Sequence, residues 1–236
     1  MKILRVIKQN IPNTITCMNL LSGCLACVFA FKFGDSFGSL KGYEMAFLMI
    51  GLAAFFDFFD GLSARLLHAY SNLGKELDSL SDLVSFGVAP AALVFNLIET
   101  QTHSPLAYLA FLIPVFGALR LARFNIDDRQ TTSFIGLPIP ANAIFWIGLV
   151  AWNMQYYYLG NLFMTVMMLA FPLLMVCDVR MFSLKVKTFA LAPNVRRYAL
   201  LLGAIGFVSY AHVAGLMWTV IFYIFLSATA KKTEHF

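Results

Sequence analysis

The stretch from Asp57 to Asp82, DFFDGLSARLLHAYSNLGKELDSLSD, constrains this chain most, because it sets four aspartates among apolar runs. Asp57 and Asp60 are three residues apart, and Asp78 and Asp82 are four residues apart. In a helix, residues at these spacings lie on the same face. Two helices joined by a short turn can therefore direct all four carboxylates at each other.

Four clustered carboxylates in a weakly polar site need a neutralising partner. A single Asp at the centre of a bilayer costs roughly 2.5–3.5 kcal/mol on insertion scales, and of the cations in the stretch we expect only Arg65 to lie near the four carboxylates. Oxygen ligands suit Mg²⁺ or Mn²⁺, and an Arg beside a metal indicates phosphate chemistry. We therefore predict a divalent-metal site made by four ligands: Asp57, Asp60, Asp78 and Asp82. Small residues leave room for a bound molecule beside it: Gly61, Ala64 and Gly74.

The same residues form the pattern D-x2-D-G-x2-A-R-x8-G-x3-D-x3-D, in which every fixed position is met. This pattern resembles the signature of the CDP-alcohol phosphatidyltransferase family. Five segments, IPNTITCMNLLSG, DFFDGLSARLL, LGKELDSLSDLVSFGVAPA, GALRLARFN and FIGLPIPANA, are similar to bacterial and archaeal members that use serine as acceptor. The resemblance spans about residues 11–145.

The resemblance implies an enzyme that transfers a phosphatidyl group from CDP-diacylglycerol to L-serine, giving phosphatidylserine and CMP. It implies a homodimer, and it implies that Asp82 acts as the general base and shares in metal binding. Two alternatives remain open. The acceptor can be glycerol 3-phosphate or an inositol compound, because the core pattern is shared. The four aspartates can instead form the ion site of a cation transporter.

The resemblance also implies a set of substrate-binding residues: Asn13, Thr16, Gly61, Ala64, Arg65, Ser71 and Gly74. Simpler roles compete with binding. Asn13 and Ser71 can cap helices, Arg65 can reach the membrane interface, and the glycines can allow close helix packing. Arg120 and Arg123 lie one turn apart and can bind a phosphate or a carboxylate, although the preference for positive charge in the cytoplasm also explains them.

The composition is that of a membrane protein, with 60% apolar and only 12% charged residues. Apolar runs of about 20 residues predict membrane spans. We expect an all-α polytopic membrane protein with eight spans, at about 14–33, 44–68, 73–98, 105–125, 139–158, 160–177, 197–212 and 214–230. The single domain would comprise a catalytic six-helix core (11–177), a cytoplasmic loop (178–196) and additional C-terminal helices (197–236).

The basic N-terminus adds one further expected element. Residues 2–10 mix apolar and basic side chains, which predicts a short amphipathic helix on the membrane surface. Pro12 is expected to break the chain before the first span, with Asn13 or Thr14 as its cap.

The Lys and Arg residues predict the orientation of the spans. With eight spans, only Lys32 and Lys41 of the seventeen Lys and Arg residues fall opposite the termini, which leaves fifteen on the other side. We therefore expect both termini and the aspartates to face the cytoplasm. The net charge of +5 follows from this bias and suits anionic membrane lipids, so it does not imply a nucleic-acid partner.

Overall fold

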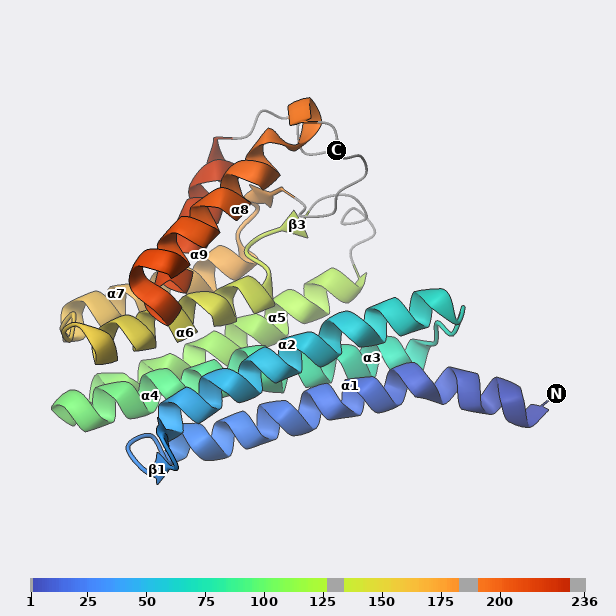
Figure 1. Cartoon of the computed structure of the whole chain (residues 1–236), viewed down its shortest axis with the longest axis horizontal. Helices are drawn as coiled ribbons and strands as arrows, with labels where there is room; N and C mark the ends of the chain where they lie inside the picture. Colours follow the sequence, from blue (N-terminus) through green and yellow to red (C-terminus); the bar gives the residue numbers. More distant parts are fainter. Residues whose placement is uncertain (1, 127–133, 183–190, 230–236) are drawn as a thin grey trace.

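The computed structural model describes residues 2–126, 134–182 and 191–229, and the side chains of residues 10–126, 135–182 and 194–229. This part is mostly helical, and most of its long helices lie side by side, with the last two helices of the chain at a steep angle to them (Figure 1). The α-helices are α1 (Lys2–Phe31), α2 (Gly42–Leu66), α3 (Asn72–Asp82), α4 (Ala89–Thr102), α5 (Leu112–Ile126), α6 (Ile139–Gln155), α7 (Asn161–Val176), α8 (Leu191–Ala211) and α9 (Gly215–Ala228). A π-helix, η1 (Leu83–Val88), joins α3 to α4, and the 3-10 helices η2 (Pro105–Phe111) and η4 (His212–Ala214) precede α5 and α9.

Two short antiparallel strand pairs connect the helices. The pair β1 (Ser36–Phe37) and β2 (Leu40–Lys41) makes the turn between α1 and α2. At this turn Gly42 touches the backbone of α1, since a Cβ on it would lie 1.8 Å from the carbonyl oxygen of Lys32. The second pair, β3 (Phe134–Ile135) and β4 (Arg180–Met181), joins the segment before α6 to the segment after α7.

Five helical stretches among the described residues are long and apolar enough to cross a membrane: Asn10–Phe31, Gly42–Leu66, Asn72–Thr102, Pro105–Ile126 and Asn194–Ala228. Helix α7 is apolar but shorter. The last stretch folds back on itself, because α8 and α9 pack together with the rings of Phe207 and Phe222 6.1 Å apart. The helices follow the expected apolar segments, and the number of eight spans stays a prediction.

The expected break at Pro12 is wrong, because Pro12 lies inside the continuous helix α1. A proline removes one backbone hydrogen bond, and membrane helices tolerate this when the remaining turns are held by packing. Helix α1 packs along α2 over much of its length, which supplies that support. Asn13 and Thr14 therefore lie within a helix and do not cap one. The amphipathic face expected for residues 2–10 depends on side chains that are outside the described ones, apart from Asn10.

Helix α8 begins at Leu191, so the last six residues of the expected loop at 178–196 are helical. Five of the seventeen Lys and Arg residues counted for the orientation lie outside the described residues: Arg129, Lys185, Lys187, Lys231 and Lys232.

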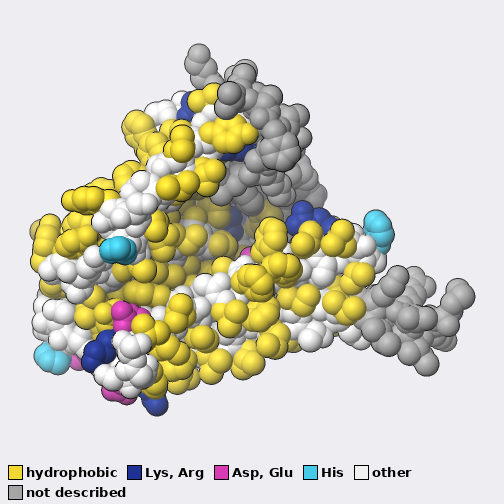
Figure 2. Space-filling view, in the orientation of Figure 1, with side chains coloured by type: hydrophobic (Ala, Val, Ile, Leu, Met, Phe, Trp, Pro, Cys, Tyr) yellow, Lys and Arg dark blue, Asp and Glu magenta, His cyan; other side chains and the backbone are white. Residues whose placement is uncertain are grey.

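Apolar side chains cover much of the outer surface of the molecule (Figure 2). Residues such as Leu21, Phe55 and Leu202 are more than half exposed there. The interior is packed around large aromatic side chains, among which Phe145 and Phe171 stack at 3.5 Å between α6 and α7. An apolar surface over a packed interior is what contact with lipid requires.

Candidate active site

The aspartates of α2 and α3 meet as the sequence predicts. One carboxylate oxygen from each of Asp57, Asp60 and Asp78 lies within 4.8 Å of the other two. Asp57 and Asp60 lie near the C-terminal end of α2, and Asp78 lies on α3, which returns after a short turn. The turn and the helical spacing together form a compact set of oxygen ligands.

This cluster has the features of a cation site. None of the four aspartates is within salt-bridge distance of a Lys, Arg or His among the described side chains. Oδ2 of Asp60 and Oδ1 of Asp78 are buried and have no hydrogen-bond partner among those side chains. Buried acceptors without partners are costly, and a divalent metal would satisfy them. The residues therefore fit the predicted metal.

Asp82 lies beside this group of three. It is only 9% exposed, and its charged neighbours include Asp57 and Asp78. Its Oδ1 accepts a hydrogen bond from Nδ2 of Asn19 on α1, at 3.4 Å. A neutral donor from another helix thus contacts Asp82, as Thr16 of α1 contacts Asp60.

A small pocket of about 210 Å³ opens next to the cluster. Asp60 and Asp78 form one side of it. Six of the residues predicted to bind substrate also line the pocket: Asn13, Thr16, Gly61, Ala64, Ser71 and Gly74. The sequence did not indicate four further lining residues: Pro12, Ala69, Tyr70 and Lys75. The aspartate cluster and this pocket thus share a wall.

The N-terminal end of α3 faces this pocket. The Ser71 hydroxyl caps α3 by accepting a hydrogen bond from the Gly74 backbone N–H, at 3.0 Å. A Cβ at Gly74 would lie 2.9 Å from Oδ1 of Asn13 and 3.1 Å from Oγ of Ser71, so the glycine keeps this wall open. Helix N-termini favour anions, and the first turn of α3 therefore suits a phosphate group.

The three candidate arginines have different surroundings. Arg65 is exposed, and its Nε donates to the carbonyl oxygen of Gly61 in its own helix. Arg123 is already paired, because it donates to the carbonyl oxygen of Val176 at 3.0 Å and to Oδ1 of Asp178 at 2.7 Å. Arg120 is only 7% exposed, its Nε has no partner among the described side chains, and its electrostatic neighbours are Asp82 and Tyr223. Of the three, Arg120 is a buried cation next to the acidic cluster.

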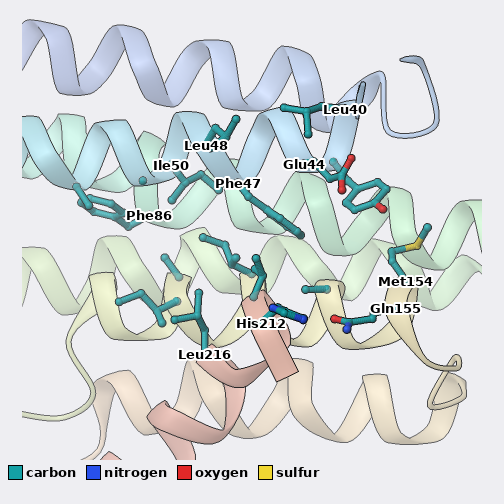
Figure 3. Close-up of a pocket in the computed structure, with 18 of the residues that line it drawn as sticks. Leu40, Glu44, Phe47, Leu48, Ile50, Phe86, Met154, Gln155, His212 and Leu216 are labelled. Carbon is teal, nitrogen blue, oxygen red and sulfur yellow. The ribbon is translucent and has the colours of Figure 1, made fainter. Parts of the chain in front are cut away.

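A larger apolar groove of about 860 Å³ lies between α2, η1, α6 and the start of α9 (Figure 3). Phe47, Ile50 and Phe86 form part of its wall, with Leu216 opposite. The polar side chains of Glu44, Gln155 and His212 also line it, away from Phe86 in the figure. The groove reaches Ala54, which precedes Asp57 by one helical turn. One part of the groove therefore lies one helical turn from the first aspartate.

Asn19 was not among the residues predicted for the site, although a pattern in the sequence of α1 could have indicated it. Three buried polar residues recur every three positions along α1: Thr16, Asn19 and Ser22. This spacing keeps them on one face of a helix. Polar residues that recur on one face of a membrane helix indicate a functional contact.

The fold and the site together define a helical membrane protein with an acidic cluster suited to a cation, beside a small polar pocket and an apolar groove. The sequence profile of the CDP-alcohol phosphatidyltransferases matches residues 9–225. The chain belongs to the CDP-alcohol phosphatidyltransferase family, and it is an integral membrane protein.

Three similar proteins all carry the name CDP-diacylglycerol–serine O-phosphatidyltransferase. The protein from Mycobacterium leprae is 36% identical over 156 residues, which are 63% of this chain and 49% of that protein. The Bacillus subtilis protein is 40% identical over 131 residues, covering 55% of this chain and 69% of the relative. The Methanocaldococcus jannaschii protein is 36% identical over 171 residues, covering 72% of each chain. The match thus spans about half the length of the mycobacterial relative and about 70% of the other two.

Proposed function

We propose that this protein transfers the phosphatidyl group of CDP-diacylglycerol to L-serine, giving phosphatidylserine and CMP. The observation that carries the proposal is the shared wall between the aspartate cluster and the small pocket. A transferase of this kind has to hold a nucleotide pyrophosphate against a metal. The names of the similar proteins support serine as the acceptor.

The donor lipid has a polar end and an apolar end, and the two cavities match them. The CDP group would occupy the small pocket, with Asn13, Thr16 and Ser71 around it and the N-terminus of α3 towards its phosphates. An acyl chain would lie in the apolar groove, which ends one helical turn from Asp57. The phosphate between the two ends would then lie at the aspartates.

The aspartates would divide the work between metal binding and proton transfer. Asp57, Asp60 and Asp78 would hold Mg²⁺ or Mn²⁺, and Asp82 would share in binding. When bound, the metal offsets the negative charge that develops on the leaving CMP. Asp82 would accept the proton of the serine hydroxyl, which is too weak an acid to attack the phosphorus unaided.

Arg120 is the residue we assign to the carboxylate of serine. It is a buried cation next to Asp82, and its Nε is free to donate among the described side chains. Arg123 already has two acceptors that join α5 to the end of α7. Binding the serine carboxylate at Arg120 would bring the serine hydroxyl close to Asp82.

The orientation and the assembly are proposals as well. The charge bias supports cytoplasmic termini and a cytoplasmic opening of the site, from which serine and CMP can exchange with water. After replacement of the native cysteines, an impermeant thiol reagent should label a cysteine at His68 from the cytoplasmic side only. A cysteine at Ser39 should be labelled only from the opposite side. The homodimer rests on the family resemblance, and the mass of the purified protein in detergent tests it.

The test of the proposed function is acceptor-dependent release of CMP by the purified protein. With CDP-diacylglycerol and Mg²⁺ or Mn²⁺, we expect CMP and phosphatidylserine to form in equal amounts when serine is added. If CMP is released with glycerol 3-phosphate or an inositol compound but not with serine, that compound is the acceptor. No release with any alcohol would exclude the transferase, and cation flux into liposomes would then test the transporter.

A further inference from the structure

A buried polar contact joins α1 to the proposed base. Asn19 has no exposed surface, and its Nδ2 lies 3.4 Å from Oδ1 of Asp82. Its Oδ1 accepts a hydrogen bond of 2.7 Å from the hydroxyl of Ser85, which also lies 3.1 Å from the Asn19 carbonyl oxygen. Ser85 is fully buried too. The three side chains thus form a chain of contacts from Ser85 through Asn19 to Asp82.

The Ser85 hydrogen bond determines which end of the Asn19 amide faces Asp82. An amide has one accepting oxygen and one donating nitrogen. With the oxygen bound to the Ser85 hydroxyl, the nitrogen is directed at the carboxylate. The reversed amide would set an oxygen against the Asp82 carboxylate, where two acceptors repel each other. Ser85 therefore acts on Asp82 through Asn19.

The backbone around these residues is shaped to allow the contact. A Cβ at Gly23 would lie 2.3 Å from Oγ of Ser85, so only a glycine permits this approach between α1 and η1. The π-helix η1 begins directly after Asp82 and contains Ser85. Wide helical turns of this type occur frequently at functional sites. The position of Ser85 thus depends on two local features of the backbone.

We propose that Asn19 is a positioning residue that holds one oxygen of Asp82 and leaves the other to accept the proton of the acceptor hydroxyl. This inference rests on the proposed function, in which Asp82 is the base. A hydrogen bond to one carboxylate oxygen restricts the rotation of the group, and a base in the wrong orientation loses turnover while the donor lipid still binds. Outer partners of this kind typically contribute roughly 10–100-fold to activity.

The test compares turnover with donor binding in Asn19→Leu, Ser85→Ala and the double variant. Asn19→Leu should lower kcat roughly 10–100-fold, with little change in the Kd of CDP-diacylglycerol. Ser85→Ala should cause a smaller loss of the same kind. In the Asn19→Leu background, Ser85→Ala should change kcat by less than about twofold, because Ser85 acts through Asn19. Ser22→Ala is the matched control, since its hydroxyl is also on a buried residue but donates to the Met18 carbonyl oxygen within α1.

Three results would overturn the proposal: wild-type kcat in Asn19→Leu, a parallel loss of donor binding, or equal effects of Ser85→Ala in both backgrounds. If Asn19→Leu does not fold, the comparison of kcat between Ser85→Ala and Ser22→Ala tests the proposal. Equal kcat values in these two variants would then overturn it. The comparison uses whichever alcohol the wild-type protein accepts. Activity with another alcohol but not with serine would count against the acceptor assignment, whereas an unchanged kcat in Asn19→Leu would count against the role of Asn19.

Discussion

At the scale of single residues, the four aspartates are distinguished by their neighbours. Asp57, Asp60 and Asp78 share a set of oxygens within 4.8 Å, and two of those residues carry buried oxygens without a partner. Asp82 lies at the edge of the cluster and accepts a hydrogen bond from Asn19. A carboxylate at the edge can take up a proton more readily than one that is enclosed by metals. The environment thus supports different roles for chemically identical groups.

We expect Asp82→Asn to lose turnover by roughly 10²–10⁴-fold while it keeps donor binding and much of its metal affinity. Asp57→Asn and Asp78→Asn should lose metal and nucleotide binding together with turnover, because they remove ligands. Calorimetric binding of CDP-diacylglycerol, set beside kcat for each variant, separates the two patterns. If Asp82→Asn and Asp57→Asn lose the binding of CDP-diacylglycerol equally, Asp82 is chiefly a metal ligand and not the base.

Substitutions of the two arginines of α5 should also have different effects. Arg120→Ala should raise the KM for serine at least about tenfold, in line with the loss of a charged hydrogen bond, and should change the KM for CDP-diacylglycerol much less. Arg123→Ala should instead lower the melting temperature, because it removes the bonds to Val176 and Asp178. Asp178→Asn should reproduce the Arg123 result. If Arg120→Ala raises only the KM for CDP-diacylglycerol, Arg120 binds a phosphate of the donor and not the carboxylate of serine.

At the scale of elements, the groove between α2, α6 and the start of α9 is where we propose that an acyl chain of the donor lipid lies. Its wall is mostly apolar, and each buried methylene contributes about 0.8 kcal/mol. Gly51 on α2 lines the groove, and a Cβ there meets no atom within 4 Å. A large side chain at this position can therefore fill the groove without a clash in the helix itself.

Gly51→Phe should raise the KM for long-chain CDP-diacylglycerol several-fold and leave the KM for a short-chain analogue unchanged. The matched control is Gly206→Phe, because Gly206 lies on α8 outside the groove and also has open space around its Cβ. Kinetics with both lipids in detergent measure the effect. The same rise for both chain lengths would show that the acyl chain lies elsewhere.

At the scale of the whole molecule, the charge of the cluster links metal binding to stability. The carboxylates repel each other across the contact between α2 and α3, and no described cation pairs with them. A bound divalent metal removes this repulsion and favours the folded state. The metal that we propose would therefore act on the stability of the fold as well as on the reaction.

Chelation should abolish activity, and Mg²⁺ or Mn²⁺ should restore it. Ca²⁺ should restore little, because its coordination is larger and looser. Mg²⁺ at about 100 times its Kd should also stabilise the protein by about 2.7 kcal/mol, seen as a higher melting temperature that Asp57→Asn no longer shows. Full activity after exhaustive chelation would contradict the metal assignment.

The sequence by itself determined the class of protein and the centre of the site. The spacing of Asp57, Asp60 and Asp78 along two helices was enough to predict their meeting, because helical periodicity is local. Apolar length predicted membrane helices for the same reason. The residues that line the small pocket belong to the stretch from Asp57 to Asp82 and to α1, which packs against that stretch.

Only the tertiary structure decided which residues from distant segments share a surface. Asn19 and Ser85 are 66 positions apart, and their contact depends on the close approach of α1 and η1 at Gly23. The different partners of Arg120 and Arg123 depend on where α7 ends and where α9 packs. The sequence predicted a helix break at Pro12 because local backbone preferences do not include the packing of α1 on α2. Contacts of this kind arise from packing between helices, which one-dimensional periodicity does not contain.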